Sequence, residues 1–310
     1  MSVTAALLLS GLQVQAFATS AKSPKPSAAA DLQGWRSQSN QPNPELNAVL
    51  PAGVASNEQA PSPVKRDGRR VKELIARRTP TSKVFQLADG RTEAELSSEP
   101  VNFQAADGTL QPIDTTVKAS RTAGFGLANE TNSFRSFFGN RADQLVRFDL
   151  DGRGLTVGAP DGSKALTPKV SGDTVTYPDV FGDADLVYQV GPDQLKESIV
   201  LASAPADPTY RFSLKLAGVK AVQQPDGSIV FSPQSGVGRP LFTMPRPFMT
   251  DARDDAASPY GKAFSDKVTQ TVTQRGANID ITVRGRQLAE QRRPAVPGGD
   301  RSDDRHRTGS

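Results

Sequence analysis

Three carboxylates lie close together in the sequence, at Asp179, Asp183 and Asp185. Their spacing near a turn could hold Ca²⁺ together with backbone carbonyls. Asp is also common in turns because its side chain accepts hydrogen bonds from local amides, and no EF-hand-type loop with a distal Glu follows. A turn role is therefore favoured, and calcium binding stays open. The same interpretation applies to a second acidic group, namely Asp251, Asp254 and Asp255.

Residues for other kinds of catalysis are scarce. The chain has no Cys, and its one His, His306, lies in a C-terminal stretch with few core-forming residues, which disfavours thiol chemistry, Cys-zinc sites and a Ser–His pair. Glycoside hydrolysis by paired Asp stays an alternative, although chance pairs are certain among 33 Asp and Glu. We therefore predict no catalytic residue, no cofactor, no bound metal and no enzymatic activity.

Aromatic side chains on a sheet face could stack on sugar rings. Six candidates lie in the strand-rich part of the chain: Phe134, Phe137, Phe138, Tyr177, Phe181 and Tyr188. Burying each contributes about 1.5 to 3 kcal/mol, and a domain with a net stability of about 5 to 15 kcal/mol cannot leave many exposed. Most of them are expected in the core, whereas Lys196 and Glu197 are expected to be solvated strand charges.

From Pro80 onward, Asp-Gly dipeptides separate short extended stretches. Asp-Gly supplies the positive φ that two-residue hairpin turns need. Four hairpins are predicted, joining 84–87 to 91–96, 101–104 to 109–113, 145–150 to 154–157, and 186–190 to 195–201. Further strands are expected at 124–127, 133–138, 174–177, 210–216, 219–223, 228–231, 241–243, 268–273 and 279–283. This pattern predicts an all-β fold, an antiparallel β-sandwich or two fused β modules, with disordered N- and C-terminal tails.

Four segments differ in composition. Residues 1–18 contain a short apolar run that ends in Ala16-Phe17-Ala18, a small-x-small site typical of signal peptides. Residues 19–79, rich in Pro, Ser and Ala, are predicted to be a disordered linker with a short helical turn near its end, within 71–76. The β-sandwich region is predicted over 80–283, and 284–310 is expected to be a disordered tail, the remainder of a frameshift or truncation.

The formal net charge is +4 at pH 7, but the basic excess belongs to the two ends of the chain. Residues 80–283 hold 20 Lys and Arg against 24 Asp and Glu. A nucleic-acid-binding domain should carry a basic face with aromatics among the charges, and that pattern is missing here. Nucleic acid is therefore not expected as a partner. The apolar run near the N-terminus is too short for a membrane span.

Four motifs occur in order along the chain: Arg78-Thr79-Pro80-Thr81-Ser82-Lys83-Val84-Phe85, Pro100-Val101-Asn102-Phe103 with Gln111-Pro112-Ile113-Asp114, Tyr177-Pro178-Asp179-Val180 through Ser198-Ile199-Val200-Leu201, and Pro245-Arg246-Pro247-Phe248-Met249 through Asn278-Ile279-Asp280. With them, residues 80–283 resemble the N-terminal β-rich region of secreted Rhs/YD-repeat, wall-associated-protein-A-like bacterial proteins, which stands before DNRLRE-type modules. Two departures are Leu110, where the family has an aromatic, and the loss of the family pattern after Arg284.

The resemblance implies a non-enzymatic structural or interaction module of a secreted, cell-wall-associated or toxin-delivering protein, here in truncated form. Its partners would be a cell-wall polymer or downstream Rhs/YD-repeat modules. A carbohydrate-binding module that recognises wall glycan is an alternative, and a glycoside hydrolase using paired Asp is another. In each case the location would be extracellular.

Overall fold

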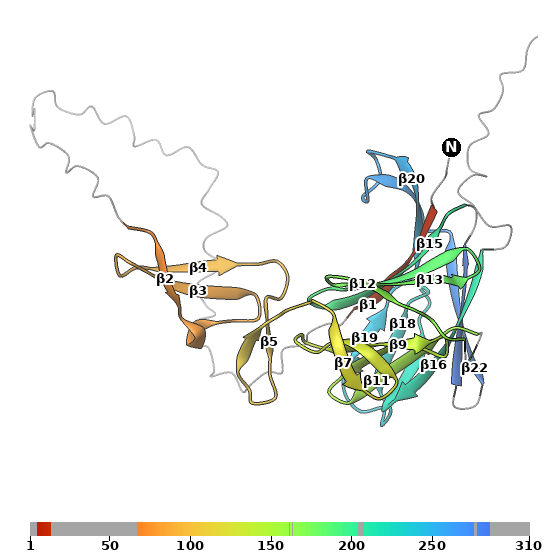
Figure 1. Ribbon diagram of the computed structural model, residues 1–310, viewed down its shortest axis with the longest axis horizontal. Helices are drawn as coiled ribbons and strands as arrows, with labels where there is room; N and C mark the ends of the chain where they lie inside the picture. Colours follow the sequence, from red (N-terminus) through yellow and green to blue (C-terminus); the bar gives the residue numbers. More distant parts are fainter. Residues whose placement is uncertain are drawn as a thin grey trace, which may run out of the picture. The chain divides into compact units, whose positions relative to one another are not determined.

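The computed structural model describes residues 5–13, 67–160, 162, 164–203, 208–275 and 278–285 (Figure 1). These residues form β-strands and one short 3-10 turn, and no α-helix occurs among them, so the predicted all-β class is confirmed. They fall into two compact units. The larger contains 5–13, 74–84 and the described residues from 94 onward, and the smaller contains 67–73 and 85–93.

The first large sheet of the larger unit has ten strands, which run β12-β13-β14-β15-β1-β19-β18-β17, with β20 paired to β1 and to β21. Their bounds are β12 Lys169–Ser171, β13 Thr174–Phe181, β14 Ala184–Val190, β15 Gln194–Leu201, β1 Ala5–Gln13, β19 Phe242–Met244, β18 Ile229–Pro233, β17 Val219–Gln223, β20 Phe248–Asp254 and β21 Lys262–Ser265. All of its pairings are antiparallel.

The second large sheet has eight strands in the order β22-β23-β16-β11-β10-β9-β8-β7. Their bounds are β22 Val268–Arg275, β23 Asn278–Gly285, β16 Thr209–Ala217, β11 Arg153–Gly158, β10 Gln144–Leu150, β9 Arg135–Arg141, β8 Phe125–Asn129 and β7 Lys118–Thr122. Its pairings are also antiparallel, and β7 is an edge strand.

The two large sheets share one hydrophobic core, which makes the larger unit a β-sandwich. Phe148 of the eight-stranded sheet lies 4.9 Å from Phe242 of the ten-stranded sheet, measured between ring centroids. Tyr177 also crosses the core: its hydroxyl donates to the backbone carbonyl of Leu145 at 2.6 Å and lies 2.9 Å from that of Gly139. Burial raises the pKa of Tyr177, so the hydroxyl stays protonated as a donor.

Alternation along the strands explains which side chains form this core. In β16, Tyr210, Phe212 and Leu214 are buried, whereas Arg211 and Lys215, which point to the other face, are exposed. The turn between β10 and β11 shows why Asp-Gly is a good signal. Asp151 has φ 52° and the following glycine has φ 77°, as a two-residue turn with both central residues at positive φ requires.

Two small sheets lie between β1 and the other sandwich strands in sequence. Their strands are β2 Arg70–Glu73, β3 Ser82–Leu87 and β4 Thr92–Leu96 in one, and β5 Asn102–Gln104 and β6 Leu110–Pro112 in the other. The side-chain amide of buried Asn102 donates to the carbonyls of Thr79 (2.7 Å) and Ser82 (3.0 Å). This contact joins the first two of the four sequence motifs and gives Asn102 a structural role.

The four predicted hairpins are present, as β3–β4, β5–β6, β10–β11 and β14–β15. The helical turn expected at the end of the linker differs: Arg70–Glu73 is a strand, because it pairs with β3, and only Ile75–Arg77 is helical, as a 3-10 turn. The leader-like segment 1–18, the rest of the linker and the tail from 286 lie largely outside the described residues, with the exception of β1.

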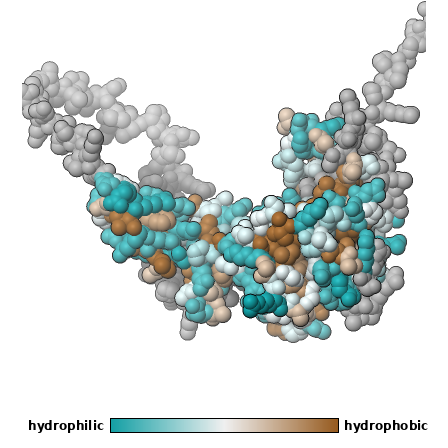
Figure 2. All heavy atoms as spheres, in the orientation of Figure 1, coloured by the Kyte–Doolittle hydropathy of each residue, from teal (hydrophilic) through white to brown (hydrophobic). Residues whose placement is uncertain are grey.

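The surface mixes polar and apolar residues. On the face in view in Figure 2, hydrophobic residues reach the surface in separate patches among hydrophilic ones. The exposed large hydrophobic residues are Val71, Ile75, Leu96, Val170, Val222, Val237 and Tyr260. Among the described residues, none belongs to a helix with the length and apolar character that crossing a membrane requires.

Candidate functional site

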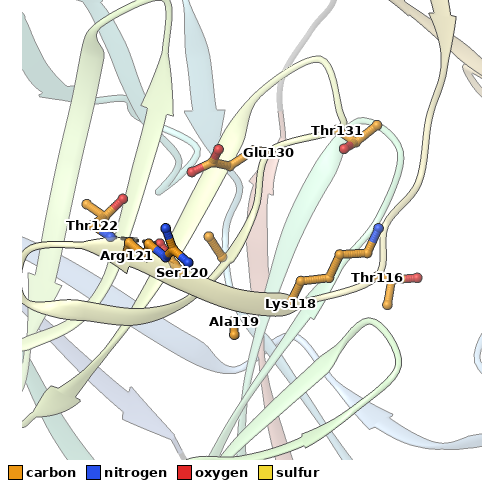
Figure 3. Close-up of a pocket in the computed structure, with 9 residues that line it drawn as sticks. Thr116, Lys118, Ala119, Ser120, Arg121, Thr122, Glu130 and Thr131 are labelled. Carbon is orange, nitrogen blue, oxygen red and sulfur yellow. Dashed lines mark hydrogen bonds between the residues drawn. The ribbon is translucent and has the colours of Figure 1, made fainter.

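A polar pocket of about 560 Å³ lies along edge strand β7 and the segment that follows β8 (Figure 3). This volume falls in the range of about 300 to 1,000 Å³ usual for ligand sites. Most of the lining residues have polar side chains: Thr116, Lys118, Ala119, Ser120, Arg121, Thr122, Ala128, Glu130 and Thr131. In Figure 3, residues 118–122 follow the β7 ribbon, and Glu130 and Thr131 come from the other segment.

Backbone and side-chain hydrogen bonds hold the two walls of the pocket together. The side-chain amide of Asn129, which is buried, donates to the carbonyls of Asp114 at 2.6 Å and Thr116 at 3.0 Å. The Asp114 N–H donates to the carbonyl of Thr131 at 2.9 Å. The sequence motif that ends in Asp114 therefore shapes one side of the pocket.

Asp114 also fixes the position of a cation in the pocket wall. Its carboxylate pairs with Lys118 at 2.7 Å and accepts the Thr116 N–H at 3.0 Å. The hydrogen bond from Lys118, with those from Thr116, holds the pKa of Asp114 well below its usual range. Asp114 is therefore ionised at neutral pH. Because the Lys118–Asp114 pair is exposed, it orients the Lys118 side chain but contributes little to the stability of the fold.

The pocket combines two cationic side chains, one carboxylate and four hydroxyls. Hydroxyls can both donate and accept hydrogen bonds, and Arg121 offers donors in a planar fork. Such a set suits a ligand rich in hydroxyl or anionic groups. Among the described residues, no group of three His, Cys, Asp or Glu is arranged to hold a metal ion.

A second candidate surface is an aromatic cluster on the β20–β21 hairpin, which sequence reasoning missed. The rings of Phe248 and Tyr260 stack with centroids 4.5 Å apart, and Phe264 lies 5.0 Å from Tyr260. Tyr260 is 49% exposed. Because the rings pack against one another, little ring face is left for a sugar to stack on.

The six aromatic residues predicted from sequence are mostly core residues, as expected. All are buried except Phe181, which is half-buried. Phe137 packs on the outer face of the eight-stranded sheet, in a small cluster with Phe125. The guanidinium carbon of Arg147 lies 4.1 Å from the Phe137 ring centre and 5.1 Å from that of Phe125, a cation–π arrangement that covers both rings.

The three carboxylates with calcium-like spacing act in a turn. The backbone N–H of Asp179, which has φ 54°, donates to the carboxylate of Asp185 at 3.1 Å. Asp183 instead lines a separate cavity of about 100 Å³, together with Phe181 and Tyr210. They are not brought together as a metal-binding group within the described part of the chain.

The second acidic group also has local partners. Asp251 is 5% exposed and pairs with Arg253 at 2.5 Å, and Asp254 pairs with Lys262 at 2.6 Å. The carboxylate of Asp255 accepts the N–H of residue 257 at 3.0 Å. These contacts stabilise the β20–β21 hairpin and its turn.

Glu197 corrects the prediction of a solvated charge. It pairs with Tyr188 across β14 and β15, and its neighbours on the same face, Leu195 and Ile199, are 1% and 0% exposed. Burial raises the pKa of Glu197 to about 7, and the hydroxyl of Tyr188 partly opposes that rise. The prediction was wrong because strand register, which sequence did not fix at this residue, turns the carboxyl inward.

This chain is similar to bacterial proteins named as tRNA nucleases. It is 28% identical over 228 residues to the tRNA(Glu)-specific nuclease WapA of Bacillus subtilis subsp. natto, covering 67% of this chain and 9% of the relative. It is 27% identical over 239 residues to the tRNA3(Ser)-specific nuclease WapA of Bacillus spizizenii, covering 71% and 10%. A tRNA nuclease WapA of Bacillus subtilis is 28% identical over 223 residues, covering 67% and 9%.

These matches support a relationship to WapA-type, wall-associated proteins. The chain spans about a tenth of the length of the curated relatives it matches. No family model matches the chain, and no solved structure matches it.

Two expectations from sequence are corrected by these names. The prediction of no enzymatic activity is contradicted, because all three relatives are named tRNA nucleases. The same names point to tRNA, against the expectation that nucleic acid is not a partner. The charge balance within 80–283 describes that segment alone, and a substrate of a longer protein need not be recorded there.

Proposed function

We propose that this chain is a module of a secreted, cell-wall-associated, toxin-like protein of the WapA kind, and that its sandwich helps to hold that protein at the wall. The observation that carries this proposal is the similarity of two thirds of the chain to WapA-type proteins. We also propose that this protein is of the Rhs/YD-repeat kind with DNRLRE modules, and that it has a role in toxin delivery.

The ligand proposed for the polar pocket is a cell-wall glycan. Sugar hydroxyls match the hydroxyls of the pocket, and anionic substituents of a wall polymer match Lys118 and Arg121. Glu130 would accept hydrogen bonds from sugar hydroxyls.

Sedimentation of the purified chain with isolated cell walls tests this proposal. Arg121→Ala should weaken binding about tenfold or more, because a hydrogen bond to a charged group contributes about 1.5 to 3 kcal/mol. Glu130→Ala should weaken binding in the same direction. Arg211→Ala, an exposed Arg on β16, is the matched control and should bind like the unaltered chain. Unchanged binding of an Arg121→Ala and Glu130→Ala double variant would refute the assignment of the pocket.

The second candidate partner is tRNA, which the relatives' names favour. We propose that the protein to which this module contributes acts on tRNA. Incubating the purified chain with total tRNA and following fragments on a denaturing gel tests whether the activity is present in these residues. Fragments that appear with the purified chain, and not after its heat inactivation, would place nuclease activity within this chain.

A further inference from the structure

Strand β1 is inserted between strands that come from the second half of the chain (Figure 1). On one side it pairs with β15, from Ala5 opposite Leu201 to Gln13 opposite Gln194. On the other side it pairs with β20, from Ala5 opposite Asp251 to Leu8 opposite Phe248, and then with β19 at Gln13. Residues 5–13 therefore use both backbone edges.

Within the described residues, β1 is the strand that joins two halves of the ten-stranded sheet. One half runs from β12 to β15, and the other contains β17 to β21. Without β1, the facing edges of β15 and β20 would present unpaired N–H and C=O groups inside a sheet. An open groove of this kind is a template for an added strand.

Strand β1 reaches the groove without a hairpin turn from either neighbour. The next described strand, β2, begins at Arg70, and the sequence between them has the Pro-rich composition of a linker. Residues 5–13 contain no Pro and no charged residue, as suits a central strand. We propose that the groove between β15 and β20 is a binding site for an extended apolar peptide, and that Ala5–Gln13 occupies it as a separable donor strand.

The tether sets the strength of this binding. A linked strand rebinds at an effective concentration on the order of millimolar, so a free peptide competes poorly until the link is cut. The leader prediction adds a consequence, because cleavage after Ala18 would cut that link and leave the donor strand held by its strand pairing alone. A free peptide of the same sequence could then exchange with the bound segment.

A cleavable tether tests the proposal on the full chain. A protease recognition sequence is placed within residues 19–66, and the folded protein is cut and passed over a sizing column. The N-terminal fragment should co-elute with the rest of the chain. A fluorescent peptide with the sequence of residues 5–13 and a solubilising tail should then replace it saturably. The same peptide with Leu8→Pro should bind about tenfold more weakly, because proline removes a ladder hydrogen bond.

A disulfide test fixes the register independently, because the chain has no Cys. Leu8→Cys with Ser198→Cys places thiols on directly opposed residues and should cross-link under mild oxidation. Leu8→Cys with Gln189→Cys, one strand further away, should not. The proposal would be overturned if the cut fragment separated on the column and neither peptide bound. Equal cross-linking of the two Cys pairs would point the same way.

Discussion

Replacing Glu197 by Gln changes one titratable group inside the sandwich and leaves its shape almost unchanged. The folded protein holds the Glu197 carboxyl among core residues and raises its pKa from 4.5 to about 7. The ionised form is therefore less stable in the folded chain than in the unfolded chain. The unfolding free energy should fall as pH rises from about 4.5 to 7, and the full penalty applies above that window.

The size of the effect follows from the shift. One pKa unit corresponds to about 1.36 kcal/mol, so the shift amounts to roughly 3 kcal/mol. The side chain of Glu197 is half-buried, and solvent screening reduces this figure to about 2 kcal/mol. The Glu197→Gln variant should match the unaltered chain near pH 4.5 and exceed it by about that amount at pH 8.

Urea denaturation followed by far-ultraviolet circular dichroism measures this difference, since the one Trp, Trp35, lies outside the described residues. Glu99→Gln removes an exposed carboxylate and serves as the control, for which no pH-dependent gain is expected. Equal pH dependence for Glu197→Gln and the unaltered chain would refute an inward, proton-holding Glu197.

Three further predictions concern contacts within the sandwich and the small sheets. Tyr177→Phe loses the hydrogen bond between the two sheets and should lower the unfolding free energy by about 1 to 2 kcal/mol, measured by urea denaturation. Asn102→Ala loses two hydrogen bonds to backbone carbonyls and should cost about 2 kcal/mol in the same assay, whereas no loss would show that this contact is dispensable. Gly154→Ala should lower the thermal midpoint at a cost of about 1 to 3 kcal/mol, because its Cβ would meet the Phe148 carbonyl at 1.9 Å, whereas Gly126→Ala meets nothing within 4 Å and should be tolerated.

Much of the fold could be predicted because local signals agree with tertiary structure. Asp151-Gly152 lies in the expected tight turn, and alternation in β16 places Tyr210 and Phe212 in the core. Strands without such signals were missed. β7 reads Lys-Ala-Ser-Arg-Thr and is held by pairing with β8, and β1 lies between strands that are far away in sequence. Pairing of this kind depends on non-local contacts that periodicity does not record.

The candidate site was harder to predict than the fold. Lys118, Arg121 and Glu130 carry no spacing that distinguishes them from ordinary surface charges. They line one pocket because Asn129 and Asp114 draw the chain on both sides of the β7–β8 hairpin together. The sequence did contain a signal for this region, since Asp114 ends one of the four motifs, but that motif indicates family and not chemistry.

Hydrogen exchange of the full chain with and without soluble wall-glycan fragments tests the central claim, that a polar pocket on this sandwich binds the cell wall. Glycan should slow exchange at residues 116–131 and leave the aromatic hairpin at 248–264 unchanged. Protection confined to 248–264, or no protection at saturating glycan, would contradict it.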